Sequence, residues 1–89
     1  MKKFLVLGLV LFGFSTLFAG HTASSDMTYN DAVAYCESKG MTLASVDQLK
    51  SWKGSDKAFW ANGGVLVWPL DGRELYSFPT NQKKGVRCE

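Results

Sequence analysis

The chain has 89 residues, and ten Lys and Arg against eight Asp and Glu give it a formal net charge of +2. Lys2 and Lys3 precede a long apolar run, so the chain from residue 20 onward is neutral, with eight basic and eight acidic residues. Nucleic-acid binding needs a concentrated basic face, which this balance excludes, and about 70 residues form a single domain with a small core.

The N-terminal segment has the pattern of a secretory signal peptide. Lys2 and Lys3 form a basic start, residues 4–14 are an almost unbroken apolar run, and small residues follow. The alternative is a transmembrane anchor, which needs about 20 predominantly apolar residues to cross the bilayer. This run is shorter and contains two glycines. We expect an exported protein, secreted or periplasmic, without a stable membrane anchor after cleavage.

The small residues Ala19, Gly20 and Ala23 offer positions for signal cleavage. We expect Ala19 to be the last residue removed, which makes residues 1–19 the signal peptide. Residues 20–26 are small and polar without a period, so they are predicted to be a flexible tail. The folded domain is expected to span residues 27–89.

The first predicted helix begins after Thr28, whose hydroxyl can cap the first turn, and ends at Gly40 in a left-handed C-cap. Asp31 suits the positive end of the helix dipole. Val33 and Cys36 lie on one apolar face at helical spacing, together with the tyrosine and alanine that precede them. The cysteine is therefore expected to face the core.

A second, shorter helix is predicted after an extended link. Ser45 and Gln48 have the spacing of a capping box, and Gly54 is expected to stop the helix. Its apolar side chains follow at helical spacing: Val46, Leu49 and Trp52. They should pack against a sheet, because an isolated helix of this length is only marginally stable.

Beyond Gly54 the sequence changes to aromatic and β-branched runs divided by turn residues, which is typical of short antiparallel strands. Asn62-Gly63-Gly64 and Asp71-Gly72 can supply the positive φ angles of tight hairpins. The predicted strands are 58–61, 65–68, 74–78 and 85–88. The expected fold class is α+β, with two short helices packed on a small antiparallel sheet.

The two cysteines, Cys36 and Cys88, are expected to form a disulfide because an exported protein enters an oxidising compartment. Such a bridge closes a loop of roughly fifty residues, and loop-closure entropy values it at about 4 kcal/mol. A domain this small usually needs such a covalent link. The alternative is two free thiols, which export disfavours.

Large aromatic residues are numerous for a domain of this size, and strand side chains alternate, so the rings cannot all face one core. Each ring can be a core residue or part of an exposed platform. In the second interpretation, Trp68 and Tyr76 flank the Asp71-Gly72 turn and form a platform with Arg73. The predicted ligand-binding residues are Trp60, Trp68, Asp71, Arg73 and Tyr76.

The order of these elements resembles the C-type-lectin-like fold. The resemblance is carried by T-Y-N-D-A-V-A-Y-C-E-S-K-G-M-T-L-A-S at 28–45, F-W-A-N-G-G-V at 59–65 and G-V-R-C-E at 85–89. It is closest to Link modules and to short bacterial lectin-like domains of unassigned role. Within this family, a cysteine on the first helix commonly bonds to one in the last strand, which matches Cys36 and Cys88.

The chain departs from the family where ligands bind. Calcium-dependent sugar binding in this fold uses a Glu-Pro-Asn or Gln-Pro-Asp loop and a Trp-Asn-Asp strand. Here the proline lies in W-P-L-D, and Asn62 and Asp71 do not supply the six or more oxygen ligands that calcium takes. The second disulfide of Link modules is also missing. We therefore expect no metal and no cofactor.

Enzyme chemistry is not indicated. His21 is the only histidine and falls in the predicted tail, where it has no nucleophile to activate. Asp71 and Glu74 can be viewed as an acid–base pair, although carboxylates beside a hairpin turn are far more often solvated charges. We expect a non-enzymatic, calcium-independent binding module for a protein or a cell-envelope glycan. The alternative is a structural or inhibitory protein that blocks a partner enzyme.

Overall fold

The computed structural model describes residues 20–89, so the predicted signal peptide over residues 1–19 lies outside the described part. The fold is α+β, as predicted, with two helices, a two-stranded antiparallel sheet of order β2-β6 and a three-stranded antiparallel sheet of order β3-β4-β5. In chain order the elements are β2 (His21–Thr22), α2 (Tyr29–Ser38), α3 (Val46–Trp52), β3 (Phe59–Ala61), β4 (Val65–Trp68), β5 (Arg73–Leu75) and β6 (Arg87–Cys88).

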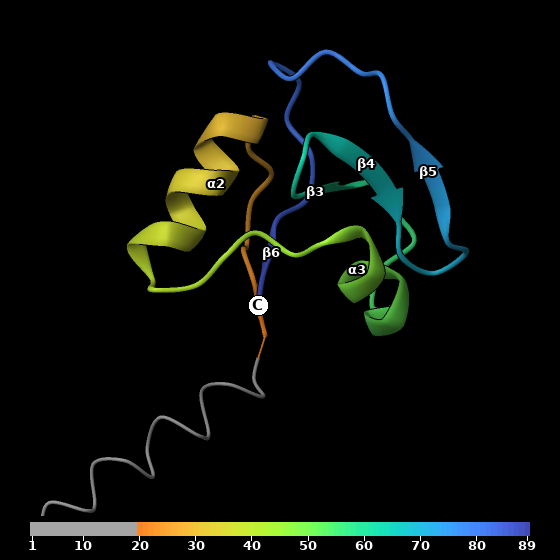
Figure 1. Cartoon of the computed structure of the whole chain (residues 1–89), viewed down its shortest axis with the longest axis horizontal. Coiled ribbons are helices and arrows are strands. Elements are labelled where there is room, and N and C mark those ends of the chain that lie inside the picture. The colour runs from red at the N-terminus through yellow and green to blue at the C-terminus, as the bar shows by residue number, and fades with distance from the viewer. Residues whose placement is uncertain (1–19) are drawn as a thin grey trace, which may run out of the picture.

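In the three-stranded sheet, β3 and β4 are covered on both faces. Phe59 and Val67 are paired across β3 and β4 and pack with Leu49 of α3. Trp60 and Leu66 form the next pair and pack with Cys36 of α2. Side chains of consecutive strand residues point to opposite faces, so the predicted alternation is confirmed. Figure 1 shows α2 and β5 at opposite sides of the molecule, with β6 between them.

Both helices begin at the predicted caps. The Thr28 hydroxyl accepts a hydrogen bond from the Asp31 amide at 3.3 Å. At α3 the Gln48 amide donates to Ser45 Oγ at 3.1 Å, and the Ser45 amide donates to Gln48 Oε1 at 2.8 Å, which is the predicted capping box. Helix α3 ends at Trp52, before Gly54, because the C-cap residue Lys53 takes the left-handed conformation with φ of 53°.

The disulfide is present, and it joins α2 to β6. Cys36 and Cys88 are both fully buried, with 5.4 Å between their Cα atoms. Cys88 is also paired with His21 of β2 on one side and with Leu43 on the other. The last strand is therefore the common neighbour of three segments that lie far apart in the sequence. Within residues 20–89, both helices are too short and too polar to cross a bilayer.

The prediction of a flexible tail over residues 20–26 is wrong, because part of this segment is paired with the C-terminal strand. His21 and Thr22 pair with Cys88 and Arg87 as strand β2, and the Ala23 amide donates to the Val86 carbonyl at 2.9 Å. The His21 ring stacks on Tyr35 of α2, with 2.6 Å between Nε2 and the tyrosine hydroxyl. A two-residue strand has no period of its own, and its partner lies at the other end of the chain, so local sequence does not indicate it.

The third predicted strand, 74–78, is also corrected. β5 covers only Arg73–Leu75, and the chain leaves the ladder before Tyr76. Phe78 packs against Trp60 with 6.3 Å between ring centroids, whereas the Tyr76 side chain is exposed. Residues 76 and 78 of a strand would point to the same face, but these two rings do not, because alternation applies only while the strand continues. β3 and β6 are likewise shorter than the predicted 58–61 and 85–88.

Candidate binding surface

The β4–β5 hairpin is tightly closed. Trp68 and Arg73 form its last cross-strand pair, and the Gly72 amide donates to the Trp68 carbonyl at 2.8 Å. Gly72 has a φ of 77°, as the predicted Asp71-Gly72 turn requires. Asp71 Oδ1 accepts from the Arg73 amide at 2.9 Å, and the Leu70 amide donates to the Ser55 carbonyl at 2.9 Å. The turn is thus fixed to itself and to the loop after α3.

Arg73 lies over the ring of Trp68. The guanidinium carbon is 4.3 Å from the ring centroid, which is a cation–π contact. Arg73 Nε also lies 3.7 Å from Asp71 Oδ2, so the side chain is held between a ring and a carboxylate. Trp68 is half-buried and packs against the core cluster on the α2 side. The structure therefore brings three of the predicted ligand-binding residues together.

Glu74 points to the other face of the sheet, toward α3. Its carboxylate accepts a hydrogen bond from Lys50 Nζ of α3 and another from the Tyr76 hydroxyl. These hydrogen bonds, the one from Lys50 first, hold the pKa of Glu74 below its usual range. The hydrogen bond to Glu74 raises the pKa of Lys50 and of Tyr76 above their usual values. Tyr76 is thus tied to α3 through Glu74, on the face away from Arg73.

Asp71 and Glu74 do not form an acid–base pair in this arrangement. Asp71 is engaged by Arg73 and by a backbone amide in the turn, and Glu74 is engaged by Lys50 and Tyr76 on the α3 side. The two carboxylates are therefore held by different partners. Asp71 is exposed, as expected of a solvated charge, whereas the Glu74 side chain is largely covered and paired with Lys50.

Large exposed apolar side chains gather on this hairpin. Within residues 20–89, the large hydrophobic residues classed as exposed are Tyr76 at 70 %, Leu70 at 55 % and Leu75 at 39 % of their full accessible area. All three lie within a stretch of seven residues, next to the Arg73–Trp68 stack. We call this region the hairpin surface, and it consists of Trp68, Leu70, Asp71, Arg73, Leu75 and Tyr76.

Trp60 does not belong to the hairpin surface, which corrects its prediction as a ligand-binding residue. Its side chain is fully buried, and Nε1 donates to the Met27 carbonyl at 3.0 Å. The ring meets Tyr29 edge-on at 5.6 Å. Trp60 follows Phe59 in a strand that is covered on both faces, so neither ring reaches the surface.

Leu70 and Leu75 were not among the predicted site residues. The signal for Leu70 was its position: an apolar side chain between Pro69 and the Asp71-Gly72 turn has little core to enter. Leu75 gave no such signal, because it is paired with the buried Leu66 and alternation alone assigns both to the same covered face. Leu75 is exposed because it lies on the outermost strand of the sheet.

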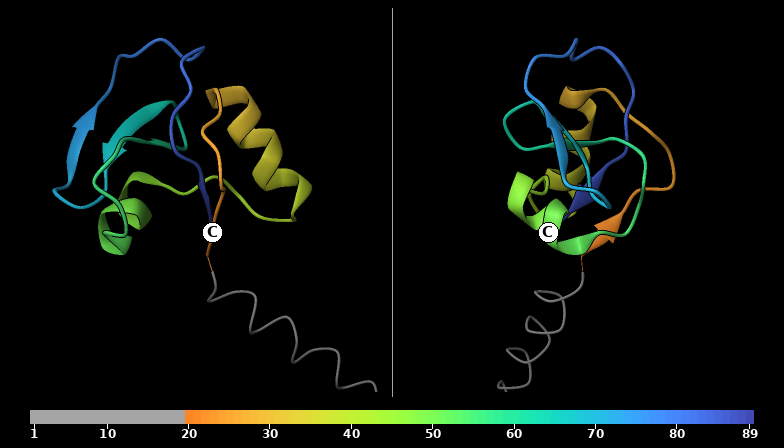
Figure 2. Two further views of the ribbon diagram at one scale, coloured as in Figure 1. Left: turned by 180° about the vertical axis from the view of Figure 1, so that it is seen from behind. Right: turned by 90° about the vertical axis from the view of Figure 1, so that its right-hand side faces the viewer.

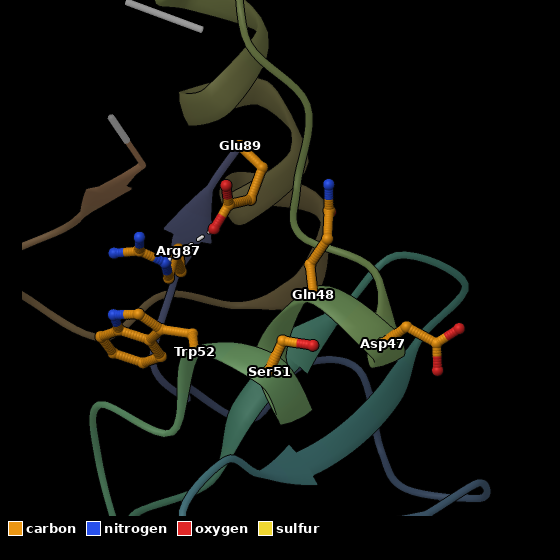
Figure 3. Close-up of a pocket in the computed structure, with 6 residues that line it drawn as sticks. All are labelled: Asp47, Gln48, Ser51, Trp52, Arg87 and Glu89. Carbon is orange, nitrogen blue, oxygen red and sulfur yellow. Dashed lines mark hydrogen bonds and ion pairs between the residues drawn. The ribbon is translucent and has the colours of Figure 1, made fainter. Parts of the chain in front are cut away.

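A depression of about 380 Å³ lies between α3 and β6, away from the hairpin surface. Figure 3 shows Arg87 beside the Trp52 ring, with 4.4 Å between the guanidinium carbon and the ring centroid. Arg87 Nε donates to Glu89 Oε2 and Nη1 donates to the Thr22 hydroxyl, both at 2.9 Å. These donors are already occupied by the chain's own acceptors. We therefore infer that Arg87 and its partners connect α3 with β2 and β6 and do not form a ligand site.

Asn62 and Asp71, the two oxygen donors that were judged insufficient for a calcium site, are also separated. Asn62 precedes β4 and Asp71 follows it, so the two side chains lie at opposite ends of that strand. Among residues 20–89, no group of three His, Cys, Asp or Glu side chains is arranged to hold a metal ion. The hairpin surface therefore consists of apolar side chains, aromatic side chains and one pair of opposite charges.

No protein-family model matches this chain, and no curated protein matches it. Function is therefore inferred from the residues of the hairpin surface and from their geometry.

Acid is expected to weaken the link between α3 and β5. A carboxyl whose pKa is lower in the folded than in the unfolded chain stabilises the fold above the unfolded-chain value of about 4.3, and the contribution is lost as the pH falls through the folded-state value. Glu74 has such a lowered pKa. Between about pH 5 and about pH 3, the wild-type Tm should therefore fall more steeply than the Tm of Glu74→Gln.

The matched control for this pH series is Glu37→Gln, on the exposed side of α2, whose side chain forms no ion pair within the described residues. This variant should keep the wild-type acid slope. Circular dichroism melts at each pH measure both. An acid slope for Glu74→Gln equal to that of the wild type would show that Lys50 and Tyr76 do not lower the free energy of the ionised carboxylate.

Proposed function

We propose that this chain is an exported, calcium-independent, C-type-lectin-like module that binds a protein partner through the hairpin surface. The observation that carries the proposal is the gathering of Leu70, Leu75 and Tyr76, exposed by 55 %, 39 % and 70 %, on a single hairpin. Large apolar side chains that are exposed close together along the chain of a small protein are candidates for an interaction site. Tyr and Arg are also the residue types enriched at the centres of protein interfaces.

A protein partner fits this surface better than a glycan. Sugar rings stack on a free aromatic face beside hydrogen-bonding groups. One face of Trp68 is covered by Arg73, and the ring also packs against the core. The hydroxyl of Tyr76 is already donated to Glu74. Leu70 and Leu75 offer no hydrogen bonds, so apolar contact with a protein is the interaction that remains.

Export and the lectin-like assignment are supported by the disulfide. It connects the first helix of the domain to its last strand, which is the pairing that the resemblance implies. A buried disulfide is also compatible with an oxidising compartment outside the cytoplasm. The signal-like N-terminal sequence gives the same indication.

For the test, the gene for all 89 residues is expressed, and the exported protein is used to capture its partner. The variant pair Leu70→Ser and Tyr76→Ser, made together, should weaken capture of a discrete protein partner by about tenfold or more, as removal of apolar anchors does. Capture should persist in the presence of a chelator. Because both side chains are exposed, the variant should keep its fold, which circular dichroism checks.

The control carries Asn30→Ser and Glu37→Ser on the exposed side of α2, at the other side of the molecule from β5 (Figure 1). It should capture the partner as well as the wild type. Equal capture by wild type and hairpin variant would overturn the proposal. Binding to a glycan array that the hairpin variant loses would assign the surface to sugars instead, and inhibition of a captured enzyme would support the inhibitory alternative.

A further inference from the structure

The connection between β3 and β4 consists of Asn62, Gly63 and Gly64, and we call it the β3–β4 turn. Asn62 and Gly63 are exposed, and the two glycines have φ angles of 102° and 84°. The other asparagines of the chain, Asn30 and Asn81, are followed by Asp and Gln, so Asn62 alone is followed by glycine. The β3–β4 turn therefore combines an exposed amide side chain with a backbone nitrogen that has no neighbouring Cβ.

An asparagine followed by glycine can react with its own backbone. The Gly63 nitrogen attacks Cγ of Asn62, a bond forms between these two atoms, the Cγ–Nδ2 bond breaks, and the amide proton leaves with the nitrogen as ammonia. Water then opens the resulting succinimide ring at one of its two carbonyl carbons, so the product is aspartate or isoaspartate. Glycine permits this close approach because it lacks a side chain, and asparagine is among the thermolabile residues of proteins.

Tyr29 holds the nitrogen that would attack. The Gly63 amide donates to the Tyr29 hydroxyl at 2.9 Å, although the two residues are 34 positions apart. Tyr29 is the first residue of α2, and its half-buried ring meets the Trp60 ring edge-on at 5.6 Å. In Figure 1 and in both views of Figure 2, the start of α2 and the β3–β4 turn both lie in the upper part of the molecule. The hydroxyl is thus positioned by α2 and the core.

The rest of the β3–β4 turn is also held by backbone hydrogen bonds. The Asn62 amide donates to the Ala44 carbonyl at 2.8 Å, and the Gly64 amide donates to the Ala61 carbonyl at 3.0 Å. Ring closure requires the Gly63 nitrogen to turn toward Asn62 Cγ, and two groups react efficiently only when they are aligned within about 3–3.5 Å. The reaction therefore begins with a local opening that breaks the hydrogen bond to Tyr29.

We propose that Asn62 is a site of spontaneous deamidation and that the Tyr29 hydroxyl slows the reaction. The inference is independent of the proposed function, because the β3–β4 turn and Asp71 lie at opposite ends of β4. Conversion adds one negative charge to a domain in which eight basic and eight acidic residues balance from residue 20 onward. The isoaspartate product also lengthens the backbone by one carbon atom, which moves the Gly63 amide relative to Tyr29.

The test follows the charge of the exported, disulfide-intact protein during several weeks at physiological temperature and neutral pH. Ion exchange separates the more acidic form, and peptide mapping by mass spectrometry locates the change. A synthetic peptide with the sequence of residues 59–65 is the unprotected reference. We expect the acidic form to carry its change at Asn62 and to accumulate about tenfold or more slowly than in the peptide, because the folded turn opens only transiently.

Two matched variants test the role of the hydroxyl. Tyr29→Phe keeps the ring against Trp60, removes the acceptor of the Gly63 amide, and should speed conversion by about threefold to tenfold, the factor that corresponds to one hydrogen bond. Tyr35→Phe is the same change on the same helix, but the Tyr35 hydroxyl lies 2.6 Å from His21 Nε2, so conversion should keep the wild-type rate. Circular dichroism melts check that both variants are folded.

A measurement on the wild type needs no variant. The Gly63 amide should exchange with solvent more slowly than its exposed position would suggest, because it is donated to Tyr29. Exchange as fast as in the reference peptide would overturn the protective role, and so would equal conversion rates in the wild type and Tyr29→Phe. Acidic product that maps to Asn30 or Asn81, or unchanged Asn62 in Tyr29→Phe after the peptide has fully converted, would overturn the site itself.

Discussion

Replacing Trp60 with alanine is expected to destabilise the domain by about 3–5 kcal/mol, the usual cost of removing a large buried ring. The Trp60 side chain is fully buried at the centre of the α2-side cluster, where it contacts Tyr29 and Phe78. A domain of this size has only about 4–10 kcal/mol of total stability. Urea or thermal unfolding should therefore show a domain that is unfolded in large part at 37 °C.

A milder variant divides the role of Trp60 into packing and hydrogen bonding. Trp60→Phe keeps a ring but removes the Nε1 donor. The Met27 carbonyl still accepts a hydrogen bond from the Lys84 amide at 2.9 Å, so the lost hydrogen bond should cost about 0.5–1.5 kcal/mol. The exposed Tyr76→Ala serves as the control and should leave the unfolding midpoint nearly unchanged. A Trp60→Ala protein as stable as the wild type would mean that the ring lies at the surface, which would restore its prediction as a ligand-binding residue.

Removing the disulfide is the second large effect. Cys36 and Cys88 are 52 residues apart, and loop-closure entropy gives about 4 kcal/mol for a ring of this length. Cys36→Ala together with Cys88→Ala should therefore lower the free energy of unfolding by about 2–5 kcal/mol. Because Cys88 is also paired with His21 and Leu43, hydrogen exchange should rise first at β2, at β6 and in the link after α2.

Reduction of the wild-type protein is the matched measurement, because it breaks the bond without deleting either sulfur atom. Dithiothreitol should shift the denaturant midpoint of the wild type toward that of the double variant and leave the double variant unchanged. A reduced protein in which both thiols react with a thiol reagent, but whose midpoint equals that of the oxidised protein, would contradict the stabilising role.

Much of the local structure was predictable because its causes lie within a few residues. The hydroxyls of Thr28 and Ser45 cap the amides three residues on, as their spacing indicated. The glycines of the two turns supply the positive φ angles that were expected there. Phe59 and Trp60 face opposite sides of the sheet because side chains in a strand alternate.

The failures concern contacts between distant segments. Residues 20–26 have the sequence of a flexible tail. They are ordered because His21 and Thr22 form backbone pairs with β6, which lies at the other end of the chain. Trp60 looks like a platform residue until α2 and α3 cover both faces of its strand. Leu75 is exposed because β5 is the outermost strand, and no sequence pattern states which strand has an open edge.

The position of the disulfide also decides how the domain carries tension. A pull between residue 20 and Glu89 first separates the two β2–β6 pairs, starting at His21 and Cys88. The load then passes through the Cys36–Cys88 bond into α2, so the covalent path between the ends runs through residues 20–36 and 88–89. Residues 37–87, which include the whole hairpin surface, lie inside the closed ring and bear no covalent load. A pull on these two ends therefore cannot extend the hairpin surface itself while the disulfide is intact.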